Sequence, residues 1–199
     1  MRFQDDDAFV RRVTGTNFTN SDRGVQALYE SGPWSTQLSL TNGSGGGAET
    51  DSGKQASWVL QFVQDGWRLG ASANFNDSDT GDRQMQNVFA GIRTGPIAWL
   101  GEADLIRDDL PDGRTQDGVA AYVEANWRFL KGHNLKLAYG YFDPNRDLDE
   151  DHRVRWGLLW EYSPFQFLQL RAGARLHDAP PQNPFDNRDE FVAEIHGFF

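Results

Sequence analysis

The sequence has no cysteine, which excludes disulfide bonds and thiolate metal sites. It also has no uncharged apolar run that approaches the ~20 residues of a transmembrane helix, and its mean hydropathy is −0.65. It has few basic residues relative to acidic ones: the 19 lysines and arginines are outnumbered by 29 acidic residues, which gives a formal net charge of −10. A nucleic-acid partner would favour a basic surface, so this balance argues against one.

What the sequence does contain is alternation, and it is clearest in the stretch from Val154 to Phe199. In residues 154–162, aromatic and aliphatic side chains take one set of alternate positions, while Arg155 and Glu161 belong to the other. Successive side chains of a strand point to opposite faces, so each such segment has one uncharged face and one polar face. This pattern is typical of a membrane barrel strand, with lipid on one side and water or a polar lumen on the other.

The same alternation begins at Gly24 and predicts about eleven strands, each near the ~9–11 residues that cross a bilayer when tilted. The connections between them alternate strictly between short ones (31–33, 65–66, 94–96, 131–133 and 163–165) and long ones (42–54, 76–83, 107–118, 143–152 and 177–189). Outer-membrane barrels have short periplasmic turns and longer extracellular loops. The sequence therefore predicts an all-β fold, a transmembrane antiparallel up-and-down β-barrel of about 11–12 strands.

Aromatic residues gather beside the short connections, among them Trp34, Trp67, Trp127 and Trp160. Rings with an apolar body and a polar edge favour the headgroup zone of a membrane, so we expect a girdle at one rim. A soluble antiparallel barrel or sandwich with its apolar face turned inward would show the same alternation in each strand. Such folds need neither a one-ended aromatic belt nor strictly alternating connections, and the membrane barrel is therefore favoured.

We divide the chain into a polar N-terminal segment, 1–23, which is a loop or partial strand, and the β-barrel, 24–199. Residues 1–7 become acidic where the apolar core of a secretory signal peptide would follow, so we expect a fragment or a product with a misplaced start. Bacterial single-chain barrels usually have an even number of strands. At least one further strand is therefore expected, either upstream or within 1–23, in a barrel of twelve strands or a larger one.

The final strand, Glu190-Phe191-Val192-Ala193-Glu194-Ile195-His196-Gly197-Phe198-Phe199, resembles the last strand of Gram-negative outer-membrane β-barrel proteins of the porin type. Gly197 stands where a bulkier apolar residue is more usual. The turn Tyr162-Ser163-Pro164-Phe165 and the strand after it are also similar to such barrels. The resemblance covers about residues 24–199 and implies a place in the outer membrane, contact with its lipid, and recognition of Phe191, Ile195 and Phe199 by the barrel-assembly machinery.

On this interpretation the charged residues of the polar face line the lumen. The basic ones are Arg68, Arg128, Lys136, Arg153, Arg155, Arg171 and Arg175, and the acidic ones include Glu102, Glu124, Glu161 and Glu194. Two interpretations remain open. The arginines of 153–175 form a basic stripe that selects anionic solutes, or the charges form a network in which they largely neutralise one another.

The function that these features favour is a porin-like channel for passive diffusion of small hydrophilic solutes or ions, with no catalytic residue, metal or cofactor. The alternative is a structural barrel that sheathes or anchors a partner such as an electron-transfer protein. Ser163 and His177 fall at opposite ends of their strands, so they cannot form a Ser/His/acid set. The acidic loop at 143–152 lacks the glycine and the bidentate glutamate of an EF-hand, because Leu148 and Val154 take their places. Oligomeric state is left open.

Overall fold

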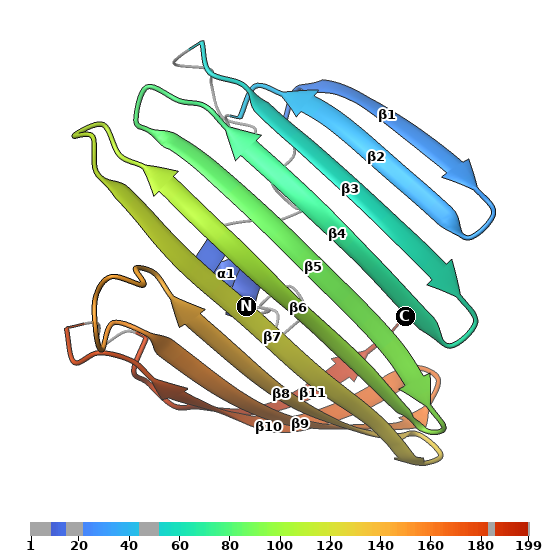
Figure 1. Cartoon of the computed structure of the whole chain (residues 1–199). Helices are drawn as coiled ribbons and strands as arrows, with labels where there is room; N and C mark the ends of the chain where they lie inside the picture. Colours follow the sequence, from blue (N-terminus) through green and yellow to red (C-terminus); the bar gives the residue numbers. More distant parts are fainter. Residues whose placement is uncertain (1–8, 15–21, 44–51, 183–185, 199) are drawn as a thin grey trace.

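The computed structural model describes residues 9–14, 22–43, 52–182 and 186–198. Its strands form one antiparallel sheet of eleven strands, paired in the order of the sequence (Figure 1). This confirms the predicted all-β, up-and-down fold. The strands are β1 (Gly24–Ser31), β2 (Trp34–Thr41), β3 (Gln55–Gln64), β4 (Trp67–Asn76), β5 (Asp82–Thr94), β6 (Ile97–Asp109), β7 (Thr115–Leu130), β8 (His133–Asp143), β9 (Arg153–Phe165), β10 (Leu168–Asp178) and β11 (Glu190–Gly197).

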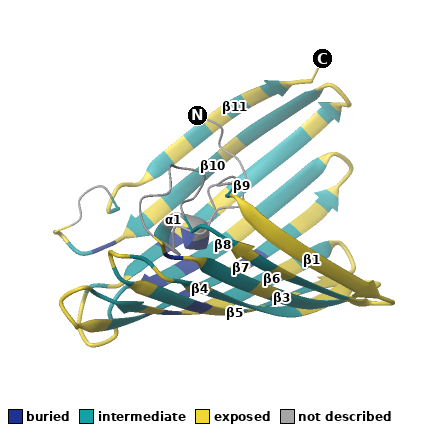
Figure 2. Cartoon of the chain, turned by 90° about the horizontal axis from the view of Figure 1, so that it is seen from above, coloured by how far each residue is buried: buried dark blue, intermediate teal, exposed yellow. Residues whose placement is uncertain are grey.

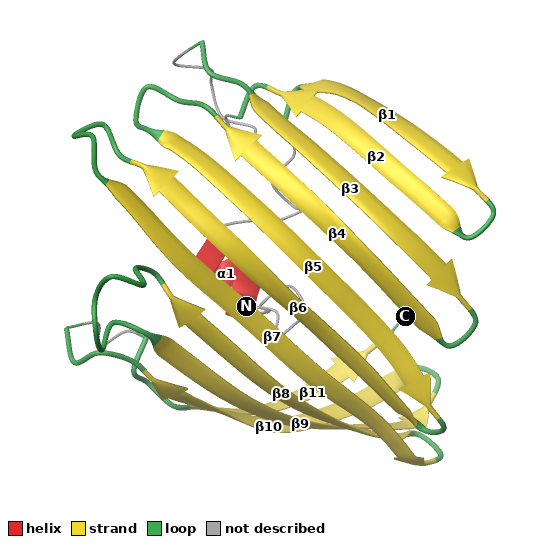
Figure 3. Cartoon of the chain, viewed as in Figure 1, coloured by secondary structure: helices red, strands yellow, loops and turns green. Residues whose placement is uncertain are grey.

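In place of the loop or partial strand predicted for residues 1–23, Phe9–Thr14 form a short helix, α1 (Figure 3). Phe9, Val10 and Val13 share one face of a helical turn and pack together against the sheet, which explains why this stretch is helical. The figures place α1 inside the curve of the sheet (Figure 2). Within the described residues, no helix is long and apolar enough to cross a membrane.

Tight turns join the strands at one end of the sheet, and glycine makes four of them possible. Gly32, Gly66, Gly95 and Gly132 have φ values of 57°, 84°, 60° and 79°, a left-handed conformation that side chains disfavour. Each of these turns is also hydrogen-bonded to the strand that follows its hairpin, because a carbonyl of the turn accepts a bond from a backbone N–H of that strand. The Ser163 N–H, for example, donates to the Gly132 carbonyl over 2.8 Å. This end of the sheet is therefore held by backbone contacts.

The reversal predicted at 163–165 lies instead at Gln166 and Phe167, between β9 and β10. Strand β9 continues through Ser163 and Pro164, which together stand opposite Gln169 in a one-residue bulge. Proline cannot donate to the ladder, so it is tolerated at a bulge and does not need to end the strand. The long loops are likewise shorter than predicted, since β6 and β7 still pair at Arg107 and Asp117.

The two faces of the sheet carry different side chains, as the alternation predicts. Large apolar residues of the convex face are open to the surroundings, such as Val88 at 58%, Val123 at 52% and Leu137 at 49% exposure. The concave face is polar and more enclosed, as Asp104 at 5% and Glu124 at 7% exposure show. β1 and β11 are the edges of the sheet. Because the strands alternate in direction, these two edges run the same way, and antiparallel closure takes an odd number of further strands.

Candidate lumen-facing site

The concave face falls into two regions of different chemistry. We call the part on β2, β3 and β4 the neutral wall, because Arg68 is the only charged residue in these strands. Its polar side chains bond across strands: the Gln61 amide donates to Ser35 Oγ over 2.9 Å, and the Asn74 amide donates to Ser57 Oγ over 2.7 Å. This wall offers neutral donors and acceptors to a lumen.

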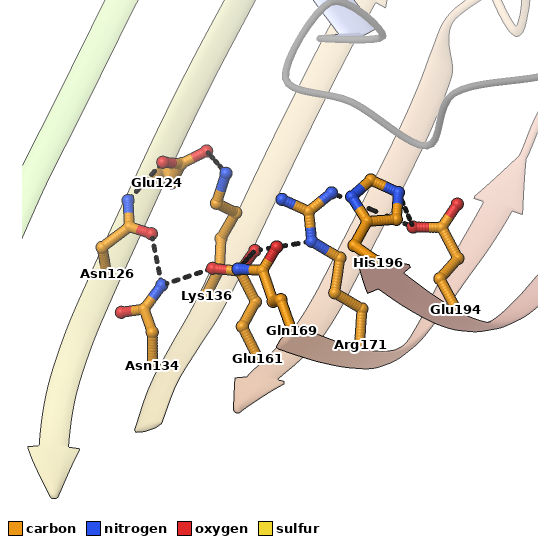
Figure 4. Close-up of polar contacts among 9 residues, drawn as sticks. All are labelled: Glu124, Asn126, Asn134, Lys136, Glu161, Gln169, Arg171, Glu194 and His196. Carbon is orange, nitrogen blue, oxygen red and sulfur yellow. Dashed lines mark hydrogen bonds and ion pairs between the residues drawn. The ribbon is translucent and has the colours of Figure 1, made fainter. Parts of the chain in front are cut away.

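The part on β7 to β11 is the charged wall, and Figure 4 shows its polar network. On β7, the Glu124 carboxylate accepts hydrogen bonds from Tyr122 and Asn126, while Lys136 Nζ on β8 lies 3.7 Å from its Oε2. Glu124 is only 7% exposed, so these partners offset the loss of water around its charge. The Asn134 amide then bonds to Asn126 over 3.4 Å, which extends the network across β8.

Glu161 on β9 is the centre of the network. Its carboxylate accepts from Asn134 over 3.0 Å and from Gln169 over 3.5 Å, and Arg171 Nε lies 3.0 Å from its Oε1. Arg171 also lies 3.9 Å from Glu194 on β11, so one guanidinium lies between two carboxylates (Figure 4). Fixed pairs of this kind are stronger than exposed ones, because the side chains are largely shielded from water.

Two more ion pairs lie nearer the loop end of the charged wall. Arg175 Nη1 lies 3.1 Å from Glu190, and Arg153 Nη1 lies 2.7 Å from Asp186. Arg153, Arg171 and Arg175, which were predicted to belong to a basic stripe, therefore have acidic partners. This arrangement matches the network interpretation of these residues; the selectivity assignment stays a prediction.

Helix α1 packs on an apolar patch inside the sheet, on strands β5 to β8. Phe9 is 2% exposed and Val10 is 5% exposed. The patch beneath them comes from four strands and consists of Met85, Ile106, Ala120 and Phe142. A Cβ built on Gly140 would lie 2.5 Å from Phe9 Cδ1, so the absence of a side chain there makes room for the ring. The helix therefore takes up space within the concavity.

Charged residues are buried around this patch. The Arg155 guanidinium carbon lies 5.2 Å from the centroid of the Phe9 ring, and Arg155 is 7% exposed. A cation above an aromatic face is attracted by the ring, so Arg155 contributes to the docking of α1. On β6, Asp104 is 5% exposed and accepts a 2.8 Å hydrogen bond from the Asn87 amide.

The loops at the other end from the tight turns are acidic. The backbone N–H and the guanidinium of Arg114 hold the pKa of Asp112 below its usual value. In the loop after β8, burial and the neighbouring Asp143 carboxylate raise the pKa of Asp151 above its usual value. Among the described residues, no group of three His, Cys, Asp or Glu side chains is placed to hold a metal ion.

The structure places every predicted lumen residue on the concave face, but it brings only some of them together. Arg68 lies over the Phe89 ring at 5.9 Å, while Arg128 lies at the short-turn end. Phe191 and Ile195 are exposed on the convex side of β11, and Phe199 lies outside the described residues. Sequence reasoning missed the amides that connect the charges, although they occupy the same alternate positions: Asn126, Asn134 and Gln169.

Comparison with protein-family models finds no match for the sequence, and neither does comparison with curated proteins. Solved structures are similar to it in fold. A porin matches with a TM-score of 0.72 and 15% identity, over 89% of this chain and 62% of the porin. A loop deletion mutant of OmpT, an outer membrane protein of Vibrio cholerae, matches with a TM-score of 0.69 and 13% identity, over 87% of this chain and 62% of the mutant.

An anion-selective porin from Comamonas acidovorans matches with a TM-score of 0.67 and 10% identity, over 87% of this chain and 55% of that porin. This chain thus spans about three fifths of the length of these proteins. At such low identity the match concerns the fold. The chain folds as an open, curved portion of a porin-type antiparallel β-barrel, with its polar face on the inside of the curve.

Proposed function

We propose that this chain is part of an outer-membrane channel, through which small hydrophilic solutes or ions diffuse passively. The observation that carries the proposal is the distribution of side chains: a concave face with ionic and hydrogen-bonded groups, and a convex face with exposed apolar residues. A contiguous apolar surface of this extent favours a lipid environment. Polar groups on the other face favour water, which is the condition for passage of hydrophilic solutes.

The porin-type fold supports the same proposal, and Ser163 and His177 lie at opposite ends of the sheet. Ser163 is at the short-turn end of β9, whereas His177 pairs with Arg155 at its loop end. We propose that lipid of a Gram-negative outer membrane covers the convex face. We further propose that Phe191 and Ile195, with Phe199, present the assembly signal. Residues 24–199 form the barrel part of the chain in this proposal.

Conductance and localisation test the proposal directly. The full chain, folded in detergent and added to a planar bilayer, is expected to give discrete conductance steps, and in cells it is expected in the outer-membrane fraction. Proteoliposomes that contain it should also swell in isosmotic sugar. A protein that stays monodisperse in buffer without detergent, or a folded protein that gives no conductance, overturns the channel. Conductance would also separate the channel from a barrel that only sheathes a partner.

The ion pairs predict the direction in which the ion selectivity of this channel should change when the arginines are removed. Arg171 and Arg175 together face three acids, Glu161, Glu190 and Glu194. Replacement of both arginines by alanine leaves these carboxylates without their cations, so the reversal potential in a KCl gradient should move toward cation preference. An unchanged reversal potential would show that these residues do not face the permeation path.

A further inference from the structure

A pocket of about 630 Å³ lies at the short-turn end of the charged wall, where the turn between β7 and β8 meets the end of β9. Several of its lining residues belong to the concave face and others to the turn itself. Those of the concave face and the turn that can donate hydrogen bonds are Arg128, Lys131, Asn134, Ser163 and Gln169. The pocket thus opens on the lumen side, at the mouth that the short turns surround.

Both register shifts among the described strand pairs fall at this pocket. On β7, Arg128 and Phe129 together stand opposite Asn134. On β9, Ser163 and Pro164 together stand opposite Gln169. Bulges bend a strand and redirect the side chains beside them, and they are frequent at barrel rims and binding sites. The two bulges therefore redirect the side chains that line one pocket.

The β7–β8 turn is also fixed against β9. Gly132 has a φ of 79°, and a Cβ at this position would lie 2.7 Å from the Ser163 carbonyl oxygen. Together with the hydrogen bond from the Ser163 N–H to the Gly132 carbonyl, this close approach holds Lys131 at the edge of the pocket. A site of this kind is shaped before any ligand arrives, which lowers the entropic cost of binding.

The charge balance of the pocket is positive. Arg128 and Lys131 form no ion pair with any other residue that the structure describes. Glu161 is the acid in the lining, and its charge is matched by Arg171, while the Asn134 and Gln169 amides also donate to it. Two cations are thus left beside a carboxylate whose acceptor capacity is largely used. Such a donor-rich hollow attracts anions.

His133 does not belong to this group of donors. It pairs with Tyr162, its ring stacks on the Tyr162 ring at 4.1 Å, and its Nδ1 accepts a 3.2 Å hydrogen bond from Trp160 Nε1, so the ring lies on the convex face. The opposite end of the sheet has a different balance, because several of its arginines are paired with aspartates, as Arg83 is with Asp108 and Arg114 with Asp112. Attraction for anions is therefore concentrated at the short-turn mouth.

We propose that this pocket is a binding site for a small multivalent anion, such as a phosphorylated or polycarboxylate solute, at the short-turn mouth. The proposal rests on the channel function proposed above, since it names a class of solute and the mouth at which it binds. Arg128 and Lys131 supply the charge, and the neighbouring amide and hydroxyl groups supply further hydrogen bonds. No covalent step is involved, because the anion binds and dissociates by exchange with water.

Titration of pyrophosphate into the full chain, folded in uncharged detergent at low ionic strength, tests the site without any need for conductance. We expect saturable binding in calorimetry, weakened about tenfold by Arg128→Gln and about tenfold by Lys131→Gln, because each removes a charge-assisted contact. Arg128→Lys should retain most of the affinity. Arg93→Gln is the matched control: Arg93 is an exposed arginine near the same mouth, but it does not line the pocket.

Absence of saturable binding overturns the site, and so does an equal loss in Arg93→Gln, which would indicate a diffuse field. A lipid headgroup offers the same phosphate chemistry. If phosphatidylglycerol in the micelles displaces pyrophosphate and phosphatidylcholine does not, the ligand is a lipid and the proposal of a water-borne anion fails. In bilayers, pyrophosphate should reduce the current from the short-turn side only. Conductance without pyrophosphate binding refutes this site alone, whereas binding without conductance refutes the channel alone.

Discussion

On β2 to β4 the concave face is built from hydroxyl and amide pairs, such as Ser35 with Gln61, whereas on β7 to β11 it is built from ion pairs around Glu161. Both regions lie on one curved sheet and have the same alternation of faces. They differ in what happens when a partner is removed. A neutral group that faces water exchanges its partner for a water molecule at little cost, but a shielded charge does not.

This difference indicates where the sheet is rigid and where it tolerates substitutions. The charged wall fixes side chains from neighbouring strands relative to one another, and helix α1 packs beside it on strands β5 to β8. The neutral wall has no helix packed on it within the described residues. We therefore expect substitutions in the charged wall to change stability and permeation together, while those in the neutral wall change either one only slightly.

The largest effect is expected for Glu161→Ala. The substitution removes the nearer of the two carboxylates beside Arg171, and it removes the acceptor of the Asn134 and Gln169 amides. Because the side chains of Glu161 and Arg171 are 16% and 14% exposed, we expect a loss of about 2–3 kcal/mol in the free energy of unfolding. Urea unfolding in lipid vesicles, followed by tryptophan fluorescence, measures it.

The double variant Glu161→Ala with Arg171→Ala is the control for this prediction. Removal of both charges should restore part of the lost stability, since the shielded guanidinium that lost its nearer carboxylate is removed as well. A loss below about 0.5 kcal/mol in the single variant would mean that the pair behaves like an exposed one. The contrast between the two walls would then disappear.

The second effect concerns the helix that packs beside the charged wall. In Gly140→Ala the new Cβ would lie 2.5 Å from Phe9 Cδ1, so the ring must move and α1 should dock less firmly. The α1 sequence contains Arg11 and Arg12, which are trypsin sites. We expect cleavage there to become about tenfold faster, because proteolysis follows the population of the undocked form.

Gly157→Ala is the matched control, since its Cβ would meet only Ala138 Cβ, at an ordinary 3.7 Å. Cleavage in this variant should stay at the original rate. If both variants are cleaved at the same rate, the close packing of the Phe9 ring on Gly140 does not control the docking of α1. Mass spectrometry of the fragments identifies the bonds that are cut.

The alternation of side chains was enough to predict the strands, the two faces and the charged residues of the concave face, because a strand's period of two depends only on local geometry. It could not predict the partners of those charges. Arg171 pairs with Glu161 and Glu194 through cross-strand register, which depends on the bulge opposite Gln169. Nor could it predict α1, whose few apolar residues become helical on packing against the sheet.

A smaller effect is expected in the neutral wall. Gln61→Ala removes the 2.9 Å hydrogen bond to Ser35, but the Ser35 hydroxyl can bond to water in a lumen. We expect a loss of about 0.5–1 kcal/mol in the free energy of unfolding, measured as for Glu161→Ala. Ser35→Ala should cost a similar amount, and the double variant no more than either. A loss as large as that of Glu161→Ala would make the two walls equivalent.

The smallest effect is a pH dependence in the acidic loop after β8. Burial and the Asp143 carboxylate raise the pKa of Asp151 above its unfolded value of 3.8, so the folded state holds this proton more tightly than the unfolded state does. The stabilisation that the proton provides is complete below pH 3.8 and declines as pH rises through the folded pKa. Asp151→Asn has no such proton to lose. As the pH rises from acid to neutral, Asp151→Asn should therefore become more stable relative to wild type, measured as the difference in melting temperature between the two proteins across that range.

Asp112→Asn should become less stable relative to wild type over the same rise in pH, because the pKa of Asp112 is lowered by Arg114. If this difference in melting temperature changes with pH in the same way for both variants, the pKa values of these two carboxylates are not shifted in opposite directions.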